Sequence, residues 1–203
     1  MPSAFHVFAL DLATKMGFAT GPAGEKPRVG EKRLKDAEDD PERGFRKLGI
    51  WLRDEFTLQI PDLVIVEAAL PIGAMVDWDG GADGRPKFKS NPQTIYFLNG
   101  LVAVVHGICG PYGVRCVNIS VQKVRKHFLG VARPADPKRA VLARCHQLGL
   151  IPKTERSDNI GDAIALHDYA GATFGRAIPA QLILHGESPA PETIESVFGG
   201  RAP

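Results

Sequence analysis

Three carboxylic acids lie in stretches of the sequence that are otherwise apolar, and a fourth lies one helical turn before the last of them. Asp11 stands within Val-Phe-Ala-Leu-Asp-Leu-Ala, Glu67 closes Leu-Val-Ile-Val-Glu, and Asp162 lies in Ile-Gly-Asp-Ala-Ile-Ala-Leu. Asp158 precedes Asp162 by four residues, so a helix would place both on one side. A buried carboxylate is unfavourable unless something compensates it. Each acid alone could equally be a cap or a salt-bridge residue, but together they predict a site for Mg²⁺ or Mn²⁺, because these ions prefer oxygen ligands.

The elements that must position these acids alternate between strands and helices. Strands are expected at 5–13, 16–20, 28–34, 62–67 and 114–119, and helices at 41–58, 91–108, 121–130, 137–149 and 158–174. Short turns between the first three strands favour an antiparallel meander. Because side chains alternate along a strand, Asp11 shares a face with Val7 and Ala9, and Glu67 shares one with Leu63 and Ile65. The order of elements predicts an α/β protein with a mixed sheet.

Length and composition are those of an ordinary globular protein. The chain has 203 residues, of which 44% are hydrophobic and 24% charged, so one domain over 1–175 is expected, with a proline-containing tail over 176–203. The glycine-rich, charged segment 71–89 is expected to be a mobile loop. No uncharged apolar stretch of 18 residues and no signal peptide are evident. Three cysteines without metal-ligand spacing favour a reducing compartment, so we expect no membrane association and a cytoplasmic location.

Positive charge is concentrated in one part of the chain. Residues 111–156 hold ten Lys and Arg against two acids, a net charge of +8, which leaves −6 on the rest of a chain whose total is +2. Such a block is typical of a surface that binds a polyanion, although a solvated basic surface would have the same composition.

Several of these segments, taken in order, resemble RuvC-type Holliday junction resolvases. The resemblance covers about residues 5–175 and rests on the first strand with Asp11 and Gly17, the second acidic strand Leu63–Glu67, the helix start at Ser90–Gln93 with Leu98–Gly100, the basic helix Val121–Gly130, the helix start Pro137–Arg139, and Asp162-Ala163. That family usually has Asp or His three residues before the final Asp, where this chain has Asn159. The fourth ligand would therefore be Asp158 or Asn159, and we favour Asp158.

The resemblance implies a fold, an activity and partners. The fold would be ribonuclease H-like, with a mixed five-stranded sheet flanked by helices. The activity would be cleavage of branched DNA by a homodimer, with two Mg²⁺ ions per active site, or Mn²⁺ in their place, held by Asp11, Glu67, Asp158 and Asp162. The phosphates would be bound by basic side chains, and Leu70 with the 71–89 loop would enter the junction. The DNA-binding residues would be Leu70, Lys87, Lys89, Lys123, Arg125, Lys126, Lys138 and Arg139.

Three other functions are compatible with parts of this pattern. A nuclease of the same fold could act on RNA:DNA hybrids or on RNA. A DNA-binding module without activity would need no acids at the site. A phosphotransferase of the actin-like type also begins with an Asp-bearing strand, but it needs a second lobe for which 203 residues are too few, and no GxxxxGK[ST] loop is present.

Overall fold

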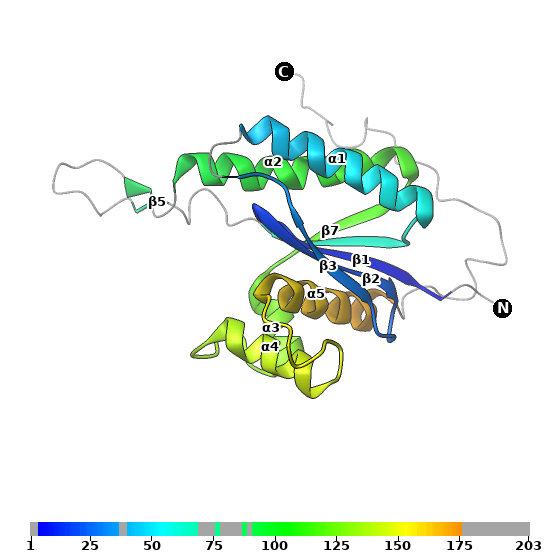
Figure 1. Cartoon of the computed structure of the whole chain (residues 1–203), viewed down its shortest axis with the longest axis vertical. Coiled ribbons are helices and arrows are strands. Elements are labelled where there is room, and N and C mark those ends of the chain that lie inside the picture. The colour runs from blue at the N-terminus through cyan, green and yellow to red at the C-terminus, as the bar shows by residue number, and fades with distance from the viewer. Residues whose placement is uncertain (1–3, 37–39, 69–75, 78–86, 89–90, 176–203) are drawn as a thin grey trace, which may run out of the picture.

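A five-stranded mixed sheet lies between two layers of helices (Figure 1). The computed structural model describes residues 4–36, 40–68, 76–77, 87–88 and 91–175. The sheet has the order β3-β2-β1-β4-β7, in which β1 pairs with β2 and β2 with β3 antiparallel, while β1 with β4 and β4 with β7 are parallel. The strands of this sheet are β1 (His6–Asp11), β2 (Lys15–Pro22), β3 (Arg28–Arg33), β4 (Leu63–Glu67) and β7 (Arg115–Ile119). The predicted meander and mixed sheet are confirmed.

Helices cover both faces of the sheet, so that two separate cores form. On one face lie α1 (Pro41–Leu58) and α2 (Pro92–Cys109), and on the other lie α3 (Val121–Leu129), α4 (Pro137–Gln147) and α5 (Asp158–Phe174) (Figure 1). Alternation along β1 supplies both cores, because Phe8 and Leu10 pack with α1 and α2 whereas Val7 and Ala9 pack with α5. The acids predicted to share the face of Val7 and Leu63 therefore point toward α5.

Local sequence signals position most helix ends. Proline stands at the start of α1, α2 and α4, where its missing N–H is not needed. The side chains of Asn91, Asp136 and Ser157 accept hydrogen bonds from the first turns of α2, α4 and α5. Asp40 and Ser120 precede α1 and α3 in extended conformations but make no side-chain capping bond. These two positions mark the helix starts through backbone geometry alone.

The segment predicted as a loop contains a short strand pair. β5 (Val76–Asp77) and β6 (Lys87–Phe88) pair antiparallel, with Val76 opposite Phe88. The rest of 71–89, Leu70 and the predicted tail 176–203 lie outside the described residues.

Helix α2 is long and largely apolar. Among the described residues, the stretch Pro92–Tyr112 has the length and composition of a membrane-crossing helix, which is weak evidence for a membrane span because the core helix of a globular protein shares both features. Phe97, Leu101 and Val105 of α2 pack into the core beneath α1.

Candidate active site

Three acidic side chains occupy one row across the sheet. Asp11 pairs with Gly17, and Gly17 pairs with Glu31. On the other side of β1, Leu10 pairs with Val66, so that Asp11 and Glu67 follow as neighbours at the ends of two parallel strands. Side chains in one row of neighbouring strands point to the same face. The row Glu31, Gly17, Asp11 and Glu67 therefore faces the helix layer that contains α5.

Glycine at position 17 allows the first turn of α5 to lie directly on this row. A Cβ atom added to Gly17 would stand 2.0 Å from the backbone oxygen of Asn159, far inside any real contact distance. The missing side chain thus creates the space in which the α5 backbone reaches the sheet. This close approach brings Asp162 near enough to Asp11 and Glu67 for its charge to raise their pKa values, and Asp158 lies one turn earlier on α5.

The pKa values show that the three central acids share one electrostatic environment. The pKa of Asp11 is raised from 3.8 to about 7, first by burial and then by the negative charges of Asp162 and Glu67. The pKa of Glu67 is raised by burial and by Asp162, and burial is also the main cause that raises the pKa of Asp162. The charges of Asp162 and Glu67 contribute to the raised pKa of Asp11, so the three carboxylates lie within electrostatic reach of one another.

The donor set fits a hard divalent cation. Asp11, Glu67 and Asp162 supply only carboxylate oxygens, which are the ligands that Mg²⁺ and Mn²⁺ prefer, and a cation would offset the repulsion that raises their pKa values. Among the residues that the structure describes, no three His, Cys, Asp or Glu side chains are already grouped closely enough to hold a metal ion. The acids converge on one place without forming a finished coordination shell in this conformation.

Asp158 and Asn159, the two candidates for a fourth ligand, are both engaged with neighbouring side chains. Asp158 Oδ2 accepts a hydrogen bond of 2.6 Å from Lys138 Nζ, and this contact holds the pKa of Asp158 below its usual value. The amide nitrogen of Asn159 donates to Glu31 Oε1 at 3.0 Å. Lys138 occupies Oδ2 of Asp158, so it would have to release this oxygen before the carboxylate could bind a metal through both oxygens.

Arg125, predicted to bind phosphate, faces the acids instead of extending freely into solvent. Its positive charge lowers the pKa values of Asp11, Glu67 and Asp162, which places the guanidinium in the same environment. Its Nε is buried and, among the described residues, has no hydrogen-bond partner. Arg125 therefore supplies part of the positive charge that makes this group of acids tolerable.

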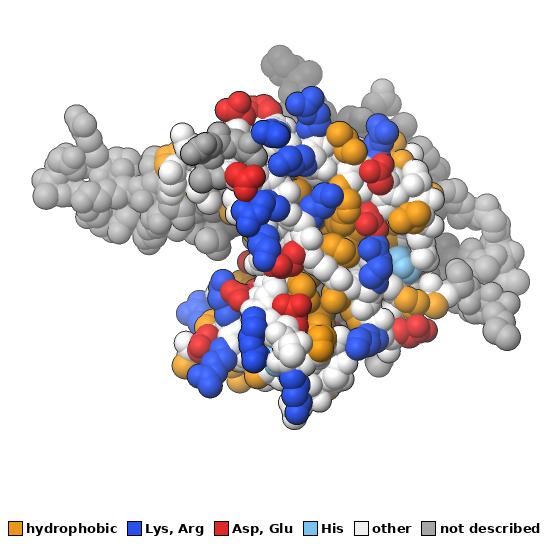
Figure 2. All heavy atoms as spheres, in the orientation of Figure 1, with side chains coloured by type: hydrophobic (Ala, Val, Ile, Leu, Met, Phe, Trp, Pro, Cys, Tyr) orange, Lys and Arg blue, Asp and Glu red, His pale blue; other side chains and the backbone are white. Residues whose placement is uncertain are grey.

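The other predicted basic residues lie around the site on the outer surface. Lys123, Lys126, Lys138 and Arg139 are exposed on α3 and α4. Figure 2 shows basic side chains, with acidic ones among them, over the end of the sheet and the α3–α4 layer. Lys87 lies in β6, where the structure describes the backbone alone. Leu70 and Lys89 lie outside the described residues.

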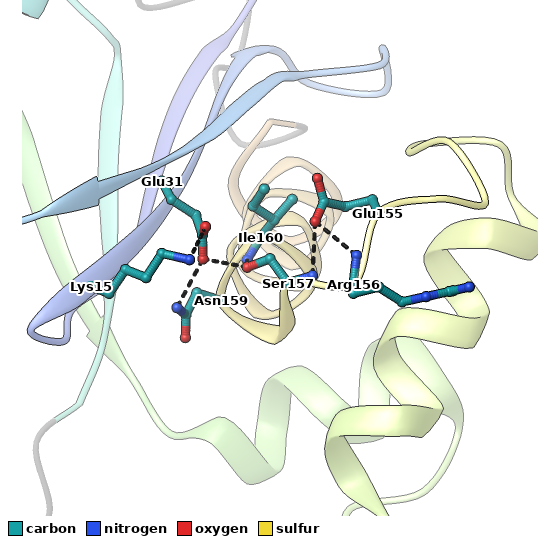
Figure 3. Close-up of polar contacts among 7 residues, drawn as sticks. All are labelled: Lys15, Glu31, Glu155, Arg156, Ser157, Asn159 and Ile160. Carbon is teal, nitrogen blue, oxygen red and sulfur yellow. Dashed lines mark hydrogen bonds and ion pairs between the residues drawn. The ribbon is translucent and has the colours of Figure 1, made fainter.

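Glu31 is a residue of this site that the sequence did not indicate. Its carboxylate accepts hydrogen bonds from Ser157 and Asn159 at the start of α5 and forms an ion pair with Lys15 (Figure 3). These contacts and the Lys15 charge outweigh its partial burial and lower the pKa of Glu31. The segment Arg-Val-Gly-Glu-Lys-Arg reads as an ordinary polar edge strand, so nothing in its composition distinguished Glu31 from the other surface acids.

Comparison with known proteins decides the fold. Over 82% of this chain, the structure is similar to Thermus thermophilus RuvC, with a TM-score of 0.59, 15% sequence identity and 93% of that chain covered. The chain has the ribonuclease H-like fold of RuvC. T. thermophilus RuvC in complex with a Holliday junction substrate matches with a TM-score of 0.59 and 12% identity, again covering 82% of this chain and 93% of that one. The yeast mitochondrial Holliday junction resolvase Ydc2 matches with a TM-score of 0.53 and 11% identity, covering 82% of this chain and 77% of that one.

The sequence comparisons add no relative to these structural ones. No family model matches the chain, and no curated protein matches it. The predicted resemblance to RuvC-type resolvases is confirmed in the fold, at sequence identities of 11–15%.

Proposed function

We propose that this chain is a metal-dependent endonuclease that cleaves branched DNA, with Holliday junctions as the substrate class. The observation that carries the proposal is the convergence of Asp11, Glu67 and Asp162 on the strand ends of a RuvC-like fold, with burial and the charges of the other acids raising their pKa values. The neighbouring structures include a RuvC bound to a Holliday junction, which supports branched DNA as the ligand class.

In this proposal, Asp11, Glu67 and Asp162 hold Mg²⁺, or Mn²⁺ in its place. When bound, such ions lower the pKa of a water molecule and stabilise the leaving oxygen during phosphodiester hydrolysis. Arg125 offsets negative charge beside these acids, and Lys123, Lys126 and Arg139 bind backbone phosphates, which positions DNA without reading its sequence.

Lys138 has two roles in the proposal. Its ammonium group pairs with Asp158 at 2.6 Å. A DNA phosphate would compete for the same ammonium group, because both partners are anionic oxygens. Phosphate binding by Lys138 would thus free the Asp158 carboxylate to act as the fourth ligand.

A homodimer is also proposed, with the outer side of α2 as the contact surface. Tyr96 on α2 is a large side chain that is 55% exposed. Tyr is among the residues enriched at protein–protein interfaces. We expect Tyr96→Glu to shift the sedimentation coefficient from dimer to monomer; an unchanged value, or a monomeric wild type, would argue against this interface.

The function is tested by mutating the central acids. We expect Asp11→Asn and Glu67→Gln to abolish nicking of a synthetic four-way junction in Mg²⁺ or Mn²⁺, while the affinity for the junction in a gel-shift assay stays within about threefold, since phosphate contacts dominate binding. Asp54→Asn, an acid on the opposite helix layer, is the matched control and should retain full activity.

The same assay separates the alternatives. Cleavage of an RNA:DNA hybrid in preference to the junction would indicate another nuclease of this fold. Junction binding by the wild type without cleavage in either metal would indicate a non-catalytic binding module. Full nicking activity in Asp11→Asn would exclude the proposed site.

A further inference from the structure

We propose that Glu31 is a positioning residue, which holds the first turn of α5 against the sheet and so sets where Asp158 and Asp162 stand relative to Asp11 and Glu67. The inference rests on the proposed function for its metal-binding consequence. It assigns a role to a residue that touches neither metal nor substrate in that proposal.

The carboxylate of Glu31 connects two parts of the chain that lie more than 120 residues apart. Its Oε1 accepts from the hydroxyl of Ser157 and, at 3.0 Å, from the amide of Asn159 (Figure 3). Ser157 is the N-cap of α5, and its hydroxyl oxygen accepts from the backbone N–H of Ile160 at 3.3 Å. One chain of hydrogen bonds therefore runs from β3 through the cap into the first turn of α5.

The partners of Glu31 bracket one of the proposed metal ligands. Ser157 and Asn159 are the residues before and after Asp158, and Asp162 follows one helical turn later. The backbone oxygen of Asn159 also lies against Gly17, where a side chain would not fit. Glu31 thus fixes the helix at the point where it comes nearest to the row of acids. A small rotation of this turn would move both α5 carboxylates.

The oxygens of Glu31 are already in use, which distinguishes it from the proposed ligands. Oε1 has two donors, and Oε2 forms an ion pair with Lys15. Lys15 neutralises the charge of Glu31, so the connection adds no net negative charge to an already acidic site. A carboxylate at a helix N-terminus also interacts favourably with the helix dipole.

The matched control is a second glutamate that forms an ion pair with a basic residue of the sheet but lies away from the acids of the site. Glu55 on α1 pairs with Arg28 on β3, and its side chain is 12% exposed, against 19% for Glu31. Removing either side chain breaks one ion pair of similar burial. Glu31→Ala and Glu55→Ala should therefore both lower thermal stability, but only the first should affect the metal site.

The test measures Mn²⁺ binding to the full chain by isothermal titration calorimetry in the absence of DNA. We expect Glu31→Ala to weaken binding about tenfold or more, as is typical for residues that orient metal ligands. Glu31→Gln should stay within about threefold of the wild type, because its amide oxygen can still accept from Ser157 and Asn159. Glu55→Ala should match the wild type. Equal Mn²⁺ affinity in the two alanine variants would overturn the proposal.

A second measurement separates this inference from the proposed function. Hydrogen exchange of the amides of Ile160 and Gly161 should be faster in Glu31→Ala than in Glu55→Ala, whether or not a metal binds. If the wild type binds no Mn²⁺, the proposed function fails, and the exchange rates alone decide whether Glu31 holds α5. Unchanged exchange in Glu31→Ala would then reject the positioning role.

Discussion

At the scale of single residues, the site is a compromise between burial and charge. Asp11, Glu67 and Asp162 are each driven toward the protonated form by desolvation, while Arg125 favours the charged form of all three. A pKa raised by burial and by like charges is a common property of functional acids. The site therefore stores free energy that is released when protons or cations bind.

This imbalance predicts how stability depends on pH. The pKa of Asp11 is about 7 in the folded protein against 3.8 in its unshifted state, so its contribution favours folding below pH 4 and is lost as the pH rises through 7. The shift corresponds to about 4 kcal/mol. In EDTA, we expect Asp11→Asn to melt roughly 5–10 °C above the wild type at pH 8, and the difference to shrink toward pH 4.

Thermal melts from pH 4 to 8 check this prediction, with Asp54→Asn as the control. Addition of Mg²⁺ at pH 8 should raise the melting temperature of the wild type and leave that of Asp11→Asn almost unchanged, because a ligand stabilises only the state that binds it. A difference between the two melting temperatures that is constant over this pH range would contradict the assigned charge state.

At the scale of elements, the close contact of α5 with β2 assembles the site. The helix carries two of the proposed ligands, and the strands carry the others. Gly17 permits the approach, and Glu31 with Ser157 holds it. The position of the α5 start above the row of acids thus depends on the absence of a side chain at Gly17 and on the carboxylate of Glu31.

The contact predicts that Gly17→Ala is destabilising although alanine is small. The added Cβ would meet the backbone oxygen of Asn159 at 2.0 Å, so the helix must move away from the sheet. We expect a loss of about 2–3 kcal/mol in urea unfolding together with loss of nicking. Gly49→Ala in α1 is the control, since its Cβ would lie at an ordinary contact distance of 3.7 Å from Cγ1 of Val104, and it should be neutral or slightly stabilising. Equal effects of both variants would be inconsistent with the contact.

At the scale of the whole molecule, charge is distributed unevenly around the sheet. The +8 block of residues 111–156 includes β7, α3 and α4, so most of it lies in the helix layer on the α5 face of the sheet. Basic surface surrounding a small acidic centre suits a nuclease, because phosphates are attracted by the surface and metal ions by the centre.

This arrangement predicts a steep dependence of DNA binding on salt. If each subunit neutralises about five phosphates, the logarithm of the binding constant should fall with that of the salt concentration at a slope near −4.5. Replacement of Lys123 and Lys126 by Ala should reduce the slope to about −2.7 for any DNA sequence. The pair Arg46→Ala and Arg53→Ala on α1 is the control. If the slope changed as much in the α1 control as in the variant of Lys123 and Lys126, the α3–α4 layer would not be the DNA-binding surface.

The sequence by itself determined the elements and the residues of greatest chemical interest. Alternation in β1, the apolar run of β4 and the proline-marked helix starts are local signals, because they depend on backbone geometry and on which face is buried. The same signals made Asp11, Glu67 and Asp162 conspicuous, since an acid in an apolar run is costly. The antiparallel start of the sheet and its mixed character followed from connection lengths.

Only the tertiary structure decided how these residues meet. The engagement of Asp158 by Lys138, the turn of Arg125 toward the acids and the connection made by Glu31 all join segments that are far apart in the chain. No local pattern encodes such contacts, because the sequence of a polar edge strand looks the same whether its side chains face solvent or the end of a helix. The pairing register across the sheet and the space above Gly17 determine that Glu31 contacts the start of α5. Both features arise only when the layers pack together.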